Sequence, residues 1–158
     1  MAIFSTVIPS PIGDLQILAS EYNVTHLFFS KDMQNMMDKE NDIIIEAKNQ
    51  LVAYFDGSRK IFDLPLAPAG TAFQKQVWNH LQTIPFGKTI SYLKMATDMG
   101  DALAIRAIAS ANGKNPIPII IPCHRVIGAN GKLVGFSGGL DKKQWLLQHE
   151  GVLPKELF

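Results

Sequence analysis

Cys123, His124 and Arg125 are the consecutive residues best suited to chemistry, and they follow an apolar run that ends at Pro122. A cysteine beside two potential cations can have its thiolate stabilised, whereas an unperturbed thiol with a pKa near 8.5 is only about 3% ionised at pH 7. Neighbours in the sequence need not face each other, so Cys123 could instead be a small apolar residue of the core. The segment predicts a candidate nucleophile, with a purely structural cysteine as the alternative.

Glu150 is a candidate partner for this segment. It falls in the last turn of a helix expected between Asp141 and Gly151, where the negative end of the helix dipole disfavours a carboxylate by about 0.3 to 1 kcal/mol. A carboxylate that orients His124, so that the imidazole withdraws the proton of Cys123, would account for an acid at this position. A solvated glutamate that tolerates the small cost is the alternative.

A helix expected from Asp101 to Asn112-Gly113 carries one long cation, Arg106, on a face of small side chains. The small residues at helical spacing from it are Ala102, Ala109, Ser110 and Gly113. A smooth face can approach a narrow minor groove closely, and a protruding arginine can fill the space left by an extruded base. Close packing between helices, with Arg106 at the rim, is the alternative. A second stripe can face the core instead and so favours an exposed Arg106: Ala104, Ile108 and Ala111.

Three further features each have two interpretations. Tyr92 can be a phenolic donor or a core aromatic residue. Asn115 precedes a proline and is either a turn residue or a site residue. The segment 135–139 (GFSGG) is either a flexible lid whose backbone N–H groups meet a ligand or a connecting loop. The four histidines show no metal-binding spacing, and we expect neither a metal nor a cofactor.

The first half of the chain is expected to form a small antiparallel sheet that carries one helix. Strand patterns at 6–8, 15–18 and 26–29 are separated by turn residues. A polar, irregular stretch at 31–41 follows, and Asp42 can then cap a helix that Gly57 ends. The apolar residues of that helix follow the 3.6-residue period: Ile44, Ala47, Leu51, Tyr54 and Phe55.

The second half is expected to be mainly helical. After a linker at 67–70, Thr71-Ala72-Phe73-Gln74 forms a capping box for a helix that buries Phe73, Val77 and Leu81 and ends by Pro85-Phe86-Gly87. Ser91 opens a short helix that stops near Gly100, and a connection of about three or four residues to the helix at Asp101 fits a helix-turn-helix. A short buried strand at 118–122 and a segment from Val126 to Val134 with an Asn130-Gly131 turn precede the last helix.

Length and composition limit the classes of protein that fit. The 158 residues are 47% hydrophobic and 18% charged, as in an ordinary globular α+β protein, and we expect two domains, 1–68 and 69–158. One cysteine excludes an internal disulfide framework. No apolar run is long enough to span a membrane, and no targeting segment is recognisable, so a soluble, cytoplasmic protein without a membrane partner is expected.

The net charge of +1 hides an asymmetry between the two halves. Residues 1–70 contain 5 basic and 9 acidic side chains, a net charge of −4, whereas residues 71–158 contain 10 basic and 5 acidic side chains, a net charge of +5. The second half is therefore the one that could face a polyanion. Splits of this size also occur in proteins that bind nothing anionic.

Over nearly its whole length, the sequence resembles the O6-alkylguanine-DNA alkyltransferases, the methylated-DNA–protein cysteine methyltransferases. The most specific part is Pro-Cys-His-Arg-Val at 122–126, set between Asn115-Pro116 and Ser137-Gly138-Gly139. The other segments that fit in register are Phe73-Gln74, Val77-Trp78, Ile84–Gly87, Ser91-Tyr92, Arg106-Ala107, Trp145–Leu147 and His149–Gly151, with Ser10–Gly13 and Tyr54–Gly57 in the N-terminal part.

The resemblance implies a fold and a reaction. The fold would be an N-terminal ribonuclease-H-like sheet with a helix, followed by a helix-turn-helix domain of winged-helix type. The protein would be a monomer that binds double-stranded DNA through the minor groove, located with the nucleoid, or in the nucleus of a eukaryote. It would flip O6-alkylguanine out of the duplex and transfer the alkyl group irreversibly to its own cysteine, once per molecule.

The resemblance also implies roles for individual residues. Cys123 would be the acceptor, activated by His124, a bridging water and Glu150, while Asn115 would brace the active-site segment. Tyr92 would contact the phosphate backbone and the extruded guanine and help to protonate it. The guanine edge would be read by the carbonyls of Cys123 and Val126 and the backbone N–H of Ser137, in a loop with Phe136 and Gly138. The DNA-binding residues would be Arg106, Tyr92, Ala102, Ala107 and Ser110.

Three departures from many members of the family stand out. Phe136 replaces a tyrosine, so a hydroxyl is lacking there. Ala109 and Ser110 replace glycines, which could alter how closely the helix approaches DNA. The zinc-binding cysteines of some N-terminal domains are missing. Other interpretations of the residues are a lesion-binding protein without transfer activity, a Cys-His hydrolase and a helix-turn-helix regulator; the first is disfavoured because Cys123 is retained.

Overall fold

The computed structural model describes residues 2–154, which form two compact units. The first unit holds the chain up to Ala69 together with Pro116–Ile120, and the second holds Gly70–Asn115 and the chain from Ile121 onward. The expected division of the chain into domains 1–68 and 69–158 stays a prediction.

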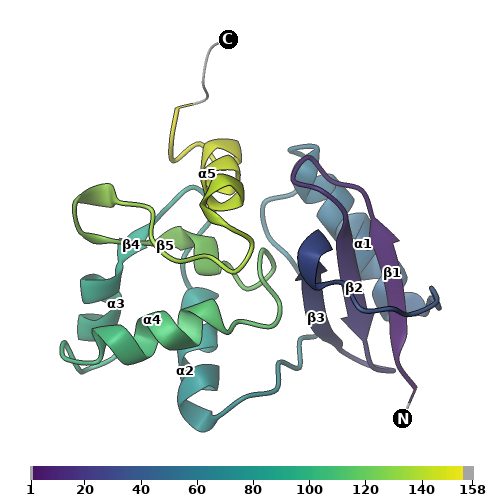
Figure 1. Ribbon diagram of the computed structural model, residues 1–158, viewed down its shortest axis with the longest axis horizontal. Coiled ribbons are helices and arrows are strands. Elements are labelled where there is room, and N and C mark those ends of the chain that lie inside the picture. Colours follow the sequence, from purple (N-terminus) through teal and green to yellow (C-terminus); the bar gives the residue numbers. More distant parts are fainter. Residues whose placement is uncertain (1, 155–158) are drawn as a thin grey trace. The chain divides into compact units, whose positions relative to one another are not determined.

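The first unit is the expected antiparallel sheet with one helix (Figure 1). Strands β1 (Phe4–Ile8), β2 (Leu15–Ala19) and β3 (Val24–Phe29) lie in the order β1-β2-β3. All five residues of β2 are buried, because it is the central strand and α1 (Asp42–Phe55) packs across the sheet. A 3₁₀ turn, η1 (Ser30–Asp32), follows β3.

Helix α1 is capped one residue earlier than expected. The side chain of Asn41, rather than Asp42, accepts a hydrogen bond from the backbone N–H of Ile44 at 2.9 Å. Asp42 is the first helical residue instead, and its negative charge interacts favourably with the positive end of the helix dipole there. The helix ends at Phe55, and Gly57 adopts a φ of +88° two residues later, a conformation that favours glycine.

The second unit is mainly helical. Its helices are α2 (Ala72–Leu81), α3 (Tyr92–Asp98), α4 (Ile105–Gly113) and α5 (Leu140–His149). Two short strands, β4 (Ile90–Ser91) and β5 (Val126–Ile127), pair in parallel. The 3₁₀ turns η2 (Cys123–Arg125) and η3 (Ala129–Gly131) flank β5 (Figure 1).

The capping box at the start of α2 is present as predicted, with hydrogen bonds in both directions between Thr71 and Gln74. Phe73, however, is 37% exposed, so its predicted burial is wrong. The residues of α2 that are buried begin one turn later, at Val77 and Trp78. The indole N–H of Trp78 donates to the carbonyl of Ala111 at 2.9 Å and so joins α2 to α4.

The helix pair α3–α4 differs from expectation at its junction. Ser91 caps α3 as predicted. Asp101 does not begin the next helix: its carboxylate accepts from the backbone N–H of Leu103 at 2.9 Å and closes a turn, so that α4 begins only at Ile105. The connection therefore runs from Met99 to Ala104, longer than predicted, and Ala102 lies outside the helix.

The expected strand at 118–122 is a buried turn. Ile119 has a φ of +73°, in the left-handed region, and the chain reverses there instead of extending. The apolar residues of this segment are buried all the same: Ile117, Ile119, Ile120 and Ile121. A short apolar run indicates burial but cannot by itself distinguish a strand from a buried turn.

The helices of residues 2–154 are too short and too polar to cross a lipid bilayer.

Candidate active site

The turn η2 places Cys123, His124 and Arg125 together in the interior. Cys123 is 2% exposed and His124 is fully buried. The turn is held by backbone hydrogen bonds from Cys123 N–H to Ile121 O at 2.8 Å and from Arg125 N–H to Pro122 O at 3.0 Å. In such a tight turn, successive side chains point in different directions, so three neighbours in the sequence can meet three different environments.

Glu150 is the shared partner of two of these side chains. Its carboxylate, fully buried as a side chain, lies 2.7 Å from Nε2 of His124 and accepts from Nε of Arg125 at 2.8 Å and Nη2 at 3.1 Å. Burial alone would raise the pKa of Glu150, but the hydrogen bonds from His124 and Arg125 and the positive charge of Arg125 hold it well below its usual range. Glu150 is thus an ionised, buried carboxylate, and the solvated alternative is wrong.

The guanidinium of Arg125 binds Glu150 and a backbone carbonyl. Besides its two bonds to Glu150, its Nη1 donates to the carbonyl of Ile84 at 2.7 Å. The cation that lowers the pKa of Cys123 is Lys143, and a contribution of Arg125 to the thiolate stays a prediction.

His124 is held as a neutral ring with one defined tautomer. Burial lowers the pKa of His124, and the neighbouring Glu150 only partly offsets this. Since an ionised carboxylate can only accept, Nε2 must carry the proton of the neutral ring, and Nδ1 keeps its lone pair. Nδ1 is buried and has no hydrogen-bond partner among residues 2–154. The ring is consequently set to accept one proton at Nδ1.

The sulfur of Cys123 is a protonated thiol in the resting protein. Burial raises the pKa of Cys123 to about 11, although a hydrogen bond from Asn115 and the charge of Lys143 oppose the rise. Asn115 is itself buried, and its Nδ2 also donates to the carbonyl of Ile121 at 2.8 Å. Asn115 thus braces the turn before Cys123, as the family resemblance implied, and it also contacts the side chain of Cys123.

Lys143 is a functional candidate that sequence reasoning missed. This residue of α5 is 0% exposed, and its Nζ donates to the carbonyls of Val126 at 2.7 Å, Val134 at 2.8 Å and Gly135 at 3.4 Å. It therefore closes the two ends of the 126–135 loop onto α5. Burial lowers the pKa of Lys143 to about 8, so it remains mostly charged at neutral pH. Its helical spacing from Leu146 and Leu147 was the available signal.

Asn112 was missed as well. It is 3% exposed, and its Nδ2 donates to the hydroxyl of Tyr92 at 3.1 Å and to the carbonyl of Cys123 at 3.3 Å. Its position one and four residues after Ala111 and Ile108 puts it on the core-facing stripe of α4. That spacing was the signal for a buried polar residue.

A pocket of about 440 Å³ lies within the second unit, in the size range of small-molecule sites. Its lining comes from α3, α4 and the loop before α5: Tyr92, Ala109, Gly113, Val134, Gly135, Phe136 and Ser137. Three predicted site residues, Tyr92, Phe136 and Ser137, are thus brought together here. Cys123 is not among the lining residues; Asn112 connects it to Tyr92 on the pocket wall.

The remaining predicted binding residues fall into a buried and an exposed group. Gly138 and Val126 are buried, and the carbonyls of Val126 and Cys123 each already accept one hydrogen bond, from Lys143 and Asn112. The predicted DNA-binding residues other than Tyr92 are exposed, in α4 and the turn before it: Ala102, Arg106, Ala107 and Ser110. An exposed Arg106 agrees with Ile108 and Ala111 facing the core.

Two family models match the chain. The one described as 6-O-methylguanine DNA methyltransferase, ribonuclease-like domain, covers residues 3–68, and the one described as 6-O-methylguanine DNA methyltransferase, DNA binding domain, covers residues 72–152.

Relatives of known name are similar over their full length. The chain is 44% identical over 154 residues to the methylated-DNA–protein-cysteine methyltransferase of Methanosarcina acetivorans, covering 94% of this chain and 99% of that one. It is 41% identical to the constitutive methylated-DNA–protein-cysteine methyltransferase of Bacillus subtilis, with 97% and 98% covered. The structure of Mycobacterium tuberculosis O6-methylguanine methyltransferase matches with a TM-score of 0.86 and 40% identity, over 98% and 97% of the chains. The Mycobacterium tuberculosis protein in complex with DNA gives the same TM-score with 41% identity, over 96% and 95%.

Replacing Glu150 by alanine should lower the free energy of unfolding by about 3 to 5 kcal/mol, because it leaves the buried guanidinium of Arg125 without its counter-ion. Chemical denaturation at neutral pH measures this change. Glu40→Ala is the matched control, since it removes a carboxylate from an exposed, 4.0 Å pair with Lys48 and should cost no more than about 0.5 kcal/mol.

The same substitution has a pH signature. Because the folded-state pKa of Glu150 lies below its ordinary value, the stability that it contributes is present above about pH 4.3 and is lost as the pH falls further, where the unfolded chain binds more protons. The difference in unfolding free energy between the wild type and Glu150→Ala should therefore shrink in acid. A difference that stays constant between about pH 6 and pH 3 would contradict the depressed pKa.

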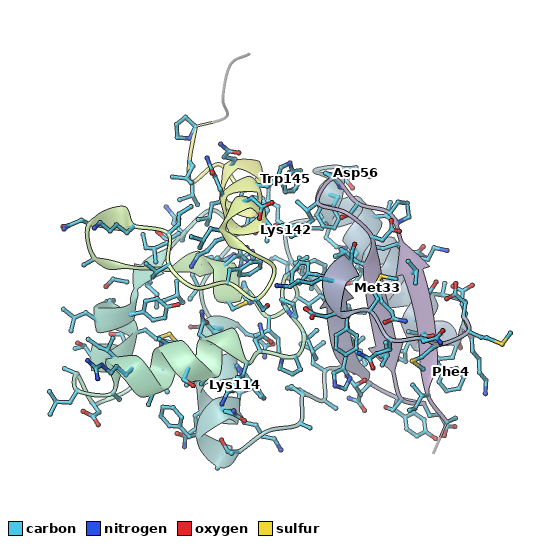
Figure 2. All side chains as sticks on the ribbon, viewed as in Figure 1. Phe4, Met33, Asp56, Lys114, Lys142 and Trp145 are labelled. Atoms are coloured by element: carbon cyan, nitrogen blue, oxygen red, sulfur yellow. The ribbon has the colours of Figure 1, made fainter. Side chains whose placement is uncertain are left out.

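Lys143→Met should destabilise the protein by roughly 2 kcal/mol or more, because it keeps the apolar stem but leaves buried carbonyls without their donor. Hydrogen exchange of the 126–135 loop should also become faster. Lys142, the preceding residue on α5 (Figure 2), has no side-chain hydrogen bond within the described chain, so Lys142→Met is the control and should change stability by less than about 0.5 kcal/mol. Equal effects of the two substitutions would show that the carbonyl contacts are unimportant.

Proposed function

Because this chain belongs to the family of methylated-DNA–protein-cysteine methyltransferases, which bind DNA and repair O6-methylguanine, we propose that it transfers the alkyl group of O6-alkylguanine to Sγ of Cys123. The observation that carries the proposal is a buried His124–Glu150 pair directly after Cys123 in η2, with Asn112 connecting Cys123 to Tyr92 on the wall of a pocket of small-molecule size. The pocket wall carries a phenolic hydroxyl, from Tyr92, that can face a base.

The proton of the thiol leaves first toward His124. Nδ1 of this ring receives it through a bridging water, and the imidazolium that results is stabilised by the ionised carboxylate of Glu150. Arg125 keeps Glu150 ionised, so the carboxylate orients the ring without taking its proton. The high pKa of Cys123 means that the thiolate forms only during the reaction, supported by Asn115 and by the charge of Lys143.

The alkyl group is then transferred from O6 of the guanine to Sγ of Cys123. A lone pair of Sγ forms the new S–C bond, the bond between O6 and the alkyl carbon breaks, and its electrons go to the guanine. Tyr92 gives its hydroxyl proton to the departing base, whose negative charge it offsets, and the proton held by His124 then returns to the phenolate oxygen of Tyr92, so that both side chains end neutral. The product is a thioether, which has no facile leaving group. Each molecule of protein therefore acts once.

The exposed face of α4 is the surface proposed for DNA. Its small residues would let the helix enter the minor groove, and Arg106, which makes no hydrogen bond or ion pair with any described residue, would occupy the space of the flipped nucleotide. Flipping costs a few kcal/mol and is least costly where pairing is already weakened. We propose that the protein does this as a monomer, with modest, salt-sensitive affinity for undamaged DNA.

Two differences from many family members lie at this site. Phe136 lines the pocket without a hydroxyl, so the polar contact to the base on that side is left to backbone groups such as the N–H of Ser137. Ala109 lines the pocket, so its side-chain methyl group, which glycine lacks, affects the pocket. Ser110 is exposed, so its side chain affects the surface proposed to face DNA.

Incubation of the wild type with a duplex that contains O6-methylguanine should add one methyl group to the peptide that contains Cys123 and restore guanine. Peptide mass spectrometry and nucleoside analysis measure the two products. Cys123→Ala should still bind the duplex but transfer nothing. Guanine restored by reduced protein whose Cys123 peptide stays unmodified would overturn the proposal.

Arg106→Ala should slow repair of duplex DNA by about tenfold or more, because the flipped state loses the side chain that fills the stack, and should change the reaction with free O6-benzylguanine much less. Lys114→Ala is the matched control: it removes the same charge from an exposed residue just beyond the C-terminal end of α4 (Figure 2). Comparable losses for the two variants on duplex DNA would mean that Arg106 contributes only charge.

A further inference from the structure

The amide of Asn112 connects three elements that surround the pocket and the nucleophile. Asn112 lies in the last turn of α4, Tyr92 is the first residue of α3, and Cys123 begins η2. Nδ2 of Asn112 is 3.1 Å from the hydroxyl oxygen of Tyr92 and 3.3 Å from the carbonyl oxygen of Cys123. One buried side chain thus contacts both the proposed proton donor and the backbone of the proposed acceptor.

The carbonyl of Cys123 determines which way this amide faces. A carbonyl can only accept a hydrogen bond, so the NH₂ group of Asn112, and not its oxygen, must face Cys123. The opposite orientation would bring two acceptor oxygens together. The amide keeps this orientation even though its Oδ1 is buried without a hydrogen-bond partner within residues 2–154, which is ordinarily a cost.

The orientation of the amide in turn determines the role of the Tyr92 hydroxyl. Because the Nδ2 atom near this hydroxyl is a donor, the oxygen of Tyr92 accepts, and its own proton must point elsewhere. Tyr92 lines the pocket, and its hydroxyl lies near Gly135 on the pocket wall, where even an added Cβ would be 4.0 Å away. No side chain at position 135 closes that side, so the proton is free to face a base in the pocket.

We infer that Asn112 is a positioning residue for the reaction: it holds the Tyr92 hydroxyl as a hydrogen-bond donor toward the departing guanine. The inference rests on the proposed function, in which Tyr92 assists the leaving base. A donated hydrogen bond also stabilises the phenolate form of Tyr92, and it opposes the rise in the pKa of Tyr92 that burial causes. Asn112 therefore both directs the hydroxyl proton and makes it easier to donate.

The effect of Asn112 on the rate should depend on how strongly the departing base needs a hydrogen bond from Tyr92. The test compares benzyl transfer from free O6-benzylguanine with benzyl transfer from an analogue in which a ring nitrogen replaces C8. The base released from the analogue is more acidic and therefore departs more easily. Asn112→Leu, of similar volume, should slow transfer from O6-benzylguanine by about 5- to 30-fold, and Tyr92→Phe by about 10- to 100-fold. Both losses should fall below about threefold with the better leaving group.

A double-variant cycle separates positioning from simple damage to the core. If Asn112 acts through the hydroxyl of Tyr92, the double variant Tyr92→Phe/Asn112→Leu should be no more than about twofold slower than Tyr92→Phe alone. Asn112→Ser, which buries less apolar volume, provides a second variant for the same cycle. Ile108→Val is the matched control, because it perturbs the buried face of the same helix without removing a hydrogen-bonding group. It should not change the ratio of rates between the two substrates.

Several outcomes would overturn the inference while leaving the proposed function intact. These are a loss in Asn112→Leu that is equal for both leaving groups, a double variant whose loss is the product of the two single losses, or a rate ratio in Ile108→Val that changes as much as in Asn112→Leu. Failure of the wild type to accept a benzyl group at Cys123 would instead overturn the proposed function itself. Peptide mass spectrometry and release of the free base distinguish the two cases.

Discussion

The buried carboxylate of Glu150 is the interaction on which the rest of the site depends. It terminates α5, yet it lies against side chains from η2, and it binds the His124 ring and the Arg125 guanidinium at the same time. A buried anion is costly unless it is paired and hydrogen-bonded, and here two cation-capable groups meet that requirement. The same bonds that stabilise the anion set the tautomer of His124 and leave Nδ1 with an unshared lone pair among residues 2–154.

The thiol and the pocket are organised by a second set of buried polar groups. Lys143 holds carbonyls at both ends of the 126–135 loop and adds positive charge near Cys123, while Asn115 braces the turn that precedes it. Asn112 connects the backbone of Cys123 to Tyr92 on the pocket wall. Burial keeps the sulfur of Cys123 protonated in the resting protein, because the hydrogen bond from Asn115 and the charge of Lys143 only partly offset the cost of a buried thiolate.

Local sequence patterns were enough to predict most elements of the fold. The alternation of apolar residues and the turn residues between them indicated the sheet, and the capping box marked the start of α2. The errors share a cause: a capping residue such as Asp101 can close a turn as well as begin a helix, and the apolar segment around Ile119 is equally compatible with a strand and with a buried turn. Tertiary packing, which local patterns do not contain, made the choice.

The sequence by itself determined the family, the candidate nucleophile and the residues of the motif around Cys123, because these depend on residue type and spacing along the chain. Only the tertiary structure decided the partners of each side chain: that Arg125 pairs with Glu150, and that Lys143 and Asn112 are buried in the site. The physical reason is that a buried charge or amide is defined by the donors and acceptors around it. Those come from segments far apart in the sequence and meet only in the folded chain.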